Sequence, residues 1–250
     1  MCKTGKDKGV VPSVEGEVEL AKIVALQAIR QQMGSQITSG AELLQGQQTK
    51  EPRWPSGLEH WDEWLGGGLA RGQLTEVISP AISSGSGLIL AALLGRARQE
   101  RRYVMLLDVG RGFSLESVPE QDLDSLLWVG CASAEEAIEA LDVASRDENF
   151  HLFLIDLRDC DPGDWRSVRA NQWYRVLGQL RQRESIGVIF ARHPVTTVAK
   201  QRMELVGRLP FECLERERSS VLPELRFRRD SLVPTEREGR RRRVESLQVG

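Results

Sequence analysis

The chain has 250 residues, which predicts either one large domain or one domain with appendages. Its formal net charge of −2 at pH 7 predicts no overall attraction to nucleic acid or acidic membranes. Its cysteines, Cys2, Cys131, Cys160 and Cys213, form no C-x-x-C pair, which argues against a zinc site or a disulfide framework. The first residues lack the apolar segment of a signal peptide, and no run reaches the roughly 18 apolar residues of a membrane span. We therefore expect a cytoplasmic protein without membrane contact.

Residues 1–53 predict an N-terminal helix and a linker. Apolar residues recur at helical spacing within residues 13–33, with glutamates early and Arg30 late, as the helix dipole favours. Residues 34–53 are rich in Gln, Gly, Ser and Thr, which is typical of a linker. We expect a separate core over residues 54–233.

Three tryptophans, Trp54, Trp61 and Trp64, gather near Pro55 and Gly57. They are either an aromatic cap over the core or a platform for a ligand. The cap is the plainer interpretation, because aromatic side chains contribute a large buried area to cores.

From residue 74 onward, short apolar runs alternate with helical segments. The runs predict buried strands over residues 74–78, 103–107, 126–129, 152–155 and 186–190. The segments between them predict helices over residues 88–98, 133–144 and 173–183, the second of which begins with a capping box of Ser133 and Glu136. This alternation predicts an α/β fold with a mostly parallel central sheet flanked by helices.

The pattern weakens beyond His193. Residues 209–214 and 224–228 are candidates for antiparallel strands near one edge of the sheet. The tail over residues 234–250 is polar and basic, and we expect it to be disordered.

Residues 79–87 have the layout of a phosphate-binding loop, because they lie between a predicted strand and a predicted helix. The working motif, G-x-x-x-x-G-K-[ST], requires Lys and Ser or Thr after its last glycine. Here Ser86 and Gly87 follow Gly85, and Ser79 replaces the opening glycine at a spacing one residue too long. Taken alone, the stretch is either an ordinary Gly/Ser turn or a phosphate loop without its chemistry.

Polar residues follow the other predicted strands as well, at 108–112, 156–159 and 192–193. Parallel sheets place their sites at the C-terminal ends of their strands, so these stretches and residues 79–87 are expected to converge.

The stretch GLEHWDEWLGGGLARGQLTEV resembles the entry segment of RecA-like proteins, in which a short helix leads through a Gly-rich turn into the phosphate-loop strand. The resemblance continues in order through YVMLLD, LLWVGCASAEEAIEALDVA, HLFLIDL and IGVIFARHP, and covers residues 56–195. It implies a RecA-like core. The predicted helix within residues 13–33 also resembles the N-terminal helix by which RecA protomers pack on one another, which implies a homo-oligomer.

The catalytic positions of that family differ here one after another. Ser86 and Gly87 stand in place of the phosphate-loop Lys and Thr, and Gly110 stands in place of the catalytic Glu. The Gln that senses the γ-phosphate falls near residues 192–193, and only Asp156 matches a Walker B-type acid. Loss of one preorganised electrostatic partner typically costs about 10²–10³ in rate, so we expect no ATP turnover.

The resemblance thus implies a vestigial nucleotide site with no catalytic residue. Its members are Ser79, Pro80, Ser83, Ser84, Gly85, Ser86, Gly87 and Asp156. Asp156 is either a magnesium ligand or an acid held by backbone N–H groups. We expect no required cofactor, with ATP and Mg²⁺ as the alternative.

The segment DSLLWVGCASAEEAIEAL resembles the ImuA group of RecA-like accessory proteins, which accompany polymerases in damage-induced translesion synthesis. This resemblance implies a role in bacterial DNA repair and damage tolerance of the SOS type. It implies RecA or a component of a translesion polymerase as the protein partner.

Several arginines are candidates for direct contact with DNA. The simpler interpretation is that they lie on solvated surfaces. The candidates are Arg166, Arg169 and Arg175 near one predicted helix, and Arg240, Arg241, Arg242 and Arg243 in the tail. Three functions therefore stay open: a RecA-like interaction protein without ATP hydrolysis, a divergent phosphate-loop ATPase that takes its cation from elsewhere, and a DNA-binding scaffold without nucleotide.

Overall fold

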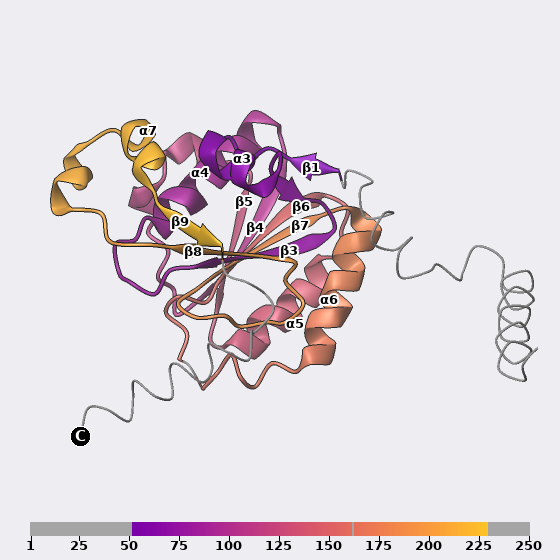
Figure 1. Cartoon of the computed structure of the whole chain (residues 1–250). Coiled ribbons are helices and arrows are strands. Elements are labelled where there is room, and N and C mark those ends of the chain that lie inside the picture. Colours follow the sequence, from indigo (N-terminus) through magenta and orange to yellow (C-terminus); the bar gives the residue numbers. More distant parts are fainter. Residues whose placement is uncertain (1–51, 162, 230–250) are drawn as a thin grey trace, which may run out of the picture. The chain divides into compact units, whose positions relative to one another are not determined.

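A computed structural model provides the fold (Figure 1). The structure describes residues 52–161 and 163–229. The helix expected within residues 13–33, the oligomer contact expected through it and the basic tail over residues 234–250 lie outside the described residues.

Helices follow the strands over residues 73–78, 126–131 and 150–156, as the sequence pattern predicts. In order, the helices and strands are β1 (Arg53–Trp54), α3 (Glu59–Leu65), β2 (Leu69–Ala70), β3 (Gln73–Ile78), α4 (Ser86–Gln99), β4 (Tyr103–Val109), β5 (Leu126–Cys131), α5 (Ala134–Ala144), β6 (Phe150–Asp156), α6 (Ala170–Arg183), β7 (Ile186–Ala191), β8 (Gln201–Leu205), α7 (Arg218–Val221) and β9 (Phe227–Arg229). Short 3₁₀ turns lie between β4 and β5 and on both sides of α7.

The central sheet has seven strands in the order β5-β4-β6-β7-β3-β8-β9. Neighbours from β5 to β8 pair in parallel, and β9 pairs antiparallel to β8. Helices α3 and α4 cover one face, and α5 and α6 cover the other (Figure 1). The expected α/β class with a mostly parallel, helix-flanked sheet is therefore confirmed.

Both faces of the sheet are apolar because the inner strands β3, β4, β6 and β7 bury side chains on both sides. One cluster lies under α3 and α4 and contains the fully buried Trp61 together with Trp54. The other lies under α5 and α6 and contains Trp173. Two of the three tryptophans in the entry segment thus belong to the core.

Helix α5 begins as the capping box predicts. The Ser133 hydroxyl accepts a hydrogen bond from the Glu136 N–H at 3.2 Å. The Glu136 carboxylate reaches back to the Ala132 N–H at 2.6 Å, one residue before the N-cap. These contacts satisfy N–H groups that the first turn of a helix leaves without partners.

The prediction of an edge strand over residues 209–214 is wrong. A 3₁₀ turn, Phe211–Glu215, occupies much of that stretch, and the partner of β9 is β8. Pro210 has no N–H to donate to a ladder, and the Leu209 N–H binds the Ser83 carbonyl at 2.8 Å. The second predicted strand, over residues 224–228, corresponds to β9 with shifted bounds.

Candidate functional site

The ends of four parallel strands meet at one edge of the sheet, as expected. Ile78 of β3 lies opposite Ala191 of β7. Asp156 of β6 lies opposite both Phe190 of β7 and Asp108 of β4. The segments that follow these strands are therefore neighbours, although they are far apart in the chain.

The loop over residues 79–87 leads from β3 into α4. The buried Ser79 donates its N–H to the Ala191 carbonyl at 2.8 Å, which ties the loop to β7. Gly85 is the N-cap of α4 and has a φ of 96°, a left-handed conformation that favours glycine. The Ser84 hydroxyl is buried and has no hydrogen-bond partner within the described residues.

The segment between β8 and β9 covers this loop. Leu209 donates its N–H to the Ser83 carbonyl, and the Leu225 side chain lies so close to Gly85 that a Cβ there would come within 2.2 Å of it. Pro80 and Gly87 stay exposed. The loop that the sequence predicts to hold a phosphate is thus packed against two leucines.

Arg158 joins the end of β6 to the start of α4. Its guanidinium makes two hydrogen bonds to the Asp156 carboxylate, through Nε at 2.8 Å and through Nη2. Its Nη1 donates to the Ser86 hydroxyl at 3.0 Å, and the guanidinium lies 5.8 Å from the centre of the Phe190 ring. The cation therefore fills the space between the strand-end acid and the first residue of the helix.

The neighbouring carboxylates raise the pKa of Arg158. Burial lowers the pKa of its guanidinium, but the hydrogen bond and charge of Asp156, with the charges of Asp159 and Asp108, raise the pKa above its usual value. The Asp156 side chain is only 4% exposed and the Arg158 side chain 20%. The pair is therefore a buried, charge-assisted contact.

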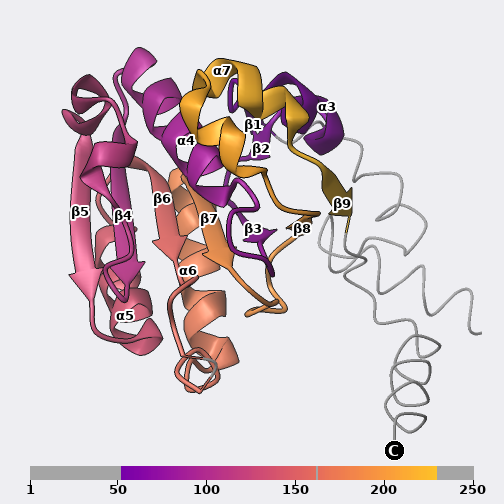
Figure 2. The same ribbon diagram turned by 90° about the vertical axis from the view of Figure 1, so that its left-hand side faces the viewer.

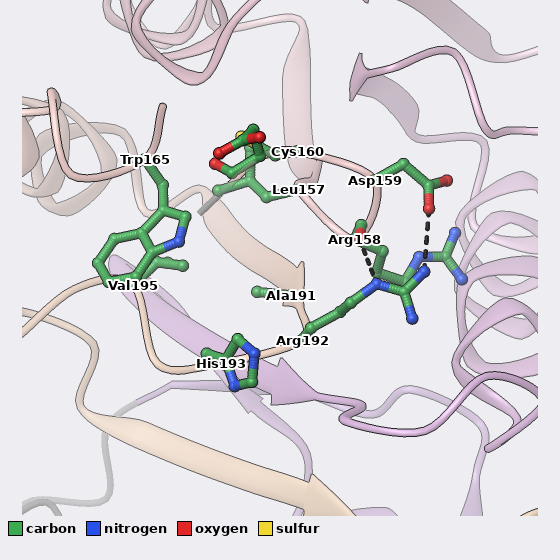
Figure 3. A pocket seen from close by; sticks show the side chains of 10 residues that line it. Leu157, Arg158, Asp159, Cys160, Trp165, Ala191, Arg192, His193 and Val195 are labelled. Atoms are coloured by element: carbon green, nitrogen blue, oxygen red, sulfur yellow. Dashed lines mark hydrogen bonds and ion pairs between the residues drawn. The ribbon is translucent and has the colours of Figure 1, made fainter. Parts of the chain in front are cut away.

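A second ion pair links the segments that follow β6 and β7 (Figure 3). Arg192, after β7, donates from Nε to the Arg158 carbonyl at 2.6 Å and from Nη2 to the Asp159 carboxylate at 3.0 Å. Asp159 in turn packs on the turn after β4, where a Cβ on Gly110 would lie 3.1 Å from the Asp159 Cβ. Gly110 has a φ of 88°, so a side chain there is both strained and crowded.

The Asp108 carboxylate is buried and hydrogen-bonded within the protein. It accepts hydrogen bonds from the N–H groups of Gly112 and Phe113, at 3.2 and 3.0 Å, and from the Trp128 indole at 3.1 Å. These three donors hold the turn after β4 and a side chain of β5, so the carboxylate does not face an open site.

A pocket of about 350 Å³ opens beside the second ion pair (Figure 3). Cys160, Trp165, Arg192 and His193 are among its lining residues. Burial and the nearby charge of Asp164 raise the pKa of the Cys160 thiol, which keeps it protonated and a poor nucleophile. No group of three potential metal ligands occurs in residues 52–161 and 163–229.

These contacts do not fit a magnesium nucleotide held as the resemblance implies. Asp156 would serve the metal, but Arg158 occupies both of its oxygens. Ser86 carries no charge for the phosphates, and its hydroxyl accepts from the same guanidinium. Gly110 offers no base for an attacking water.

The arginines considered for DNA lie in different surroundings. Arg175 pairs with Asp142 of α5 at 2.9 Å, and Arg166 stacks over the Trp165 ring at 5.4 Å. Arg169 is exposed and immediately precedes α6. The four arginines over residues 240–243 lie outside the described residues.

Sequence reasoning missed the two ion pairs at the strand ends. The sequence contains a signal for one of them, because Arg158 lies two residues after Asp156 and places a cation beside that acid. No local pattern connects Arg158 to Ser86, which is 72 residues away, or Arg192 to Asp159, which is 33 residues away.

None of the helices in residues 52–161 and 163–229 has both the length and the apolar character to span a bilayer. The chain matches no protein-family model and no curated protein sequence.

Proposed function

We propose that this chain is a RecA-like protein of bacterial DNA repair and damage tolerance that acts in the cytoplasm by binding protein partners, without hydrolysing ATP. RecA or a component of a translesion polymerase is the proposed partner. The family assignment depends on the ordered resemblance over residues 56–195. A mostly parallel sheet with the loop over residues 79–87 between a central strand and a helix is consistent with it.

The observation that carries the non-catalytic part is the placement of the Arg158 guanidinium between Asp156 and Ser86. A cation held by a buried carboxylate takes the coordination sites that a divalent metal would need. The chain thereby keeps the strand-end acid as a structural counter-ion, which explains why the acid is present although the phosphate-loop lysine is not.

Two measurements test the proposal. Purified protein is expected to show no ATP hydrolysis above background, with or without single-stranded DNA. DNA-stimulated hydrolysis that disappears in Asp156→Ala would overturn the non-catalytic part. A deletion strain of the source organism is expected to lose viability or damage-induced mutagenesis after ultraviolet irradiation, and an unchanged response would overturn the role in damage tolerance.

One observation favours a second candidate, a phosphate-loop protein whose cation comes from β6. Arg158 Nη1 lies 3.0 Å from the Ser86 hydroxyl, next to the N-terminus of α4. An anion bound there would have to compete with Asp156 for the guanidinium. Calorimetry with ATP, with and without Mg²⁺, separates the two candidates, since only the second predicts binding that Arg158→Gln abolishes.

A further inference from the structure

A groove of about 830 Å³ lies between the start of α4 and the segment that joins β8 to β9. Figure 2 shows this segment, with α7, beside α4. One wall is formed by residues 82–88 and the other largely by residues 208–221. The hydrogen bond from the Leu209 N–H to the Ser83 carbonyl joins the two walls.

Large apolar side chains are exposed along this groove. Phe211 is 81% exposed, Leu214 75% and Ile82 69%. Phe211 and Leu214 are the most exposed of the large apolar side chains in the described residues, and they belong to the same 3₁₀ turn. Contiguous apolar side chains on a surface are typical of an interaction site, whereas scattered ones are ordinary.

The charged residues that line the groove all have one sign. They are Arg158, Arg208, Arg216 and Arg218, and no carboxylate side chain lines it. Arg158 and Arg216 are neutralised by Asp156 and Glu224. Arg208 and Arg218 form no ion pair within the described residues, and the N-terminus of α4 adds partial positive charge.

The chemistry of the lining discriminates between two kinds of anionic occupant. Single-stranded nucleic acid binds on aromatic side chains that stack with successive bases. Phe211 is the only aromatic residue in the lining, and the other apolar side chains are aliphatic. Aliphatic and aromatic anchors beside unpaired cations suit an amphipathic peptide with carboxylates at its rim.

We propose that the groove binds an acidic amphipathic segment of a partner protein, with apolar side chains of that segment on Ile82, Phe211 and Leu214 and its carboxylates near Arg208 and Arg218. This proposal rests on the proposed protein-binding function and assigns it a surface. Residues 82–88 line the groove, so the segment that packs against the loop over residues 79–87 also forms part of the docking surface.

A direct test uses a fluorescein-labelled peptide with Leu or Phe at positions i, i+3, i+4 and i+7 and Glu elsewhere, titrated with the full-length chain by fluorescence anisotropy. The acidic peptide is expected to bind, with an affinity that falls with salt. A peptide with Lys in place of Glu and a poly(dT) oligonucleotide are expected to bind at least about tenfold more weakly, because both lack one half of the complementary chemistry.

Variants locate the binding. Phe211→Ser with Leu214→Ser, and separately Arg208→Glu with Arg218→Glu, should each weaken binding of the acidic peptide by about tenfold or more. Val143→Ser, which changes an apolar side chain that is 70% exposed on α5, and Arg183→Glu on α6 should leave it unchanged. Because Arg208, Phe211 and Leu214 are exposed and Arg218 is only partly buried, the variants should unfold at the same urea concentration as wild type.

Several results would overturn the proposal. They are no binding of the acidic peptide, equal binding of the Lys peptide, tighter Phe211-dependent binding of the oligonucleotide, or self-association in sedimentation that Phe211→Ser abolishes. Complementation of the deletion strain distinguishes a failure of the groove assignment from a failure of the proposed function. If the deletion strain is damage-sensitive and the double serine variant rescues it fully, the groove assignment fails and the damage role stands. If the deletion strain is not sensitive, the proposed function itself fails.

Discussion

Arg158 holds the Asp156 carboxylate and the Ser86 hydroxyl at the same time, and thereby connects the end of β6 to the first turn of α4. Both partners lie at positions where the sequence resemblance predicts nucleotide chemistry. At these positions the side chains therefore form a structural contact between the sheet and a helix.

Asp156→Ala is expected to lower the free energy of unfolding by about 3 kcal/mol, because it leaves the largely buried Arg158 cation without its partner. Urea denaturation followed by circular dichroism measures the change. Replacing both residues, with Asp156→Ala and Arg158→Met, should cost less than the sum of the single changes. Additive losses would contradict a direct coupling between the two side chains.

Ser86→Lys combined with Gly87→Thr would give the loop the Lys and Thr of the phosphate-loop motif. This double variant is expected to show no ATP turnover. The new ammonium would meet the Arg158 guanidinium, which now lies 3.0 Å from the Ser86 hydroxyl, so the variant should also be less stable than wild type.

The matched control for that change is Gly87→Ala. A Cβ at Gly87 meets Arg158 only at 3.9 Å, and alanine favours a helix over glycine by about 1 kcal/mol, so this variant should be at least as stable as wild type. Turnover in the double variant would contradict the prediction, since Gly110 still supplies no base and has no room for one.

Glu76→Gln is expected to destabilise the fold by about 3 kcal/mol and to loosen the segment after β7. The fully buried Glu76 carboxylate accepts from the N–H groups of Val195 and Thr196, at 3.0 and 2.9 Å, and pairs with Arg202. Hydrogen exchange should speed up at the Val195 and Thr196 amides well before global unfolding. Unchanged protection of these amides would show that another contact holds the segment.

Stability is expected to fall as the pH drops from 7 toward 5, with His151 as one contributor. Burial and the charge of Arg102 lower the pKa of His151. A neutral imidazole can accept from Arg102, whose Nη1 lies 2.8 Å from Nε2, and protonation removes that acceptor. The unfolded chain therefore binds this proton more tightly, and the stability present above its unfolded pKa is lost at lower pH.

His151→Gln is the variant that checks the assignment. Its free energy of unfolding, measured by urea titration at several pH values, should depend less on pH over this range than that of wild type. An identical slope in both proteins would assign the pH dependence to other groups.

The sequence alone predicts the elements of the core well, because the forces that define them are local. The runs that become β4, β6 and β7 are continuously apolar, and a strand buried on both faces needs that composition. The Ser133 cap is also local, since its hydroxyl bonds an N–H three residues ahead. The edge strand was misplaced, because Leu209 is held by a carbonyl from a distant loop.

Only the tertiary structure decides what the strand ends do. The sequence shows Ser86 and Gly110 at the positions where the resemblance places a lysine and a catalytic glutamate, and Asp156 at the position of a Walker B-type acid. It did not determine that Arg158 meets Ser86 or that Asp159 crowds Gly110, because these contacts depend on which strands become neighbours. Strand order is set by the packing of both sheet faces at once, and no local window of residues contains that information.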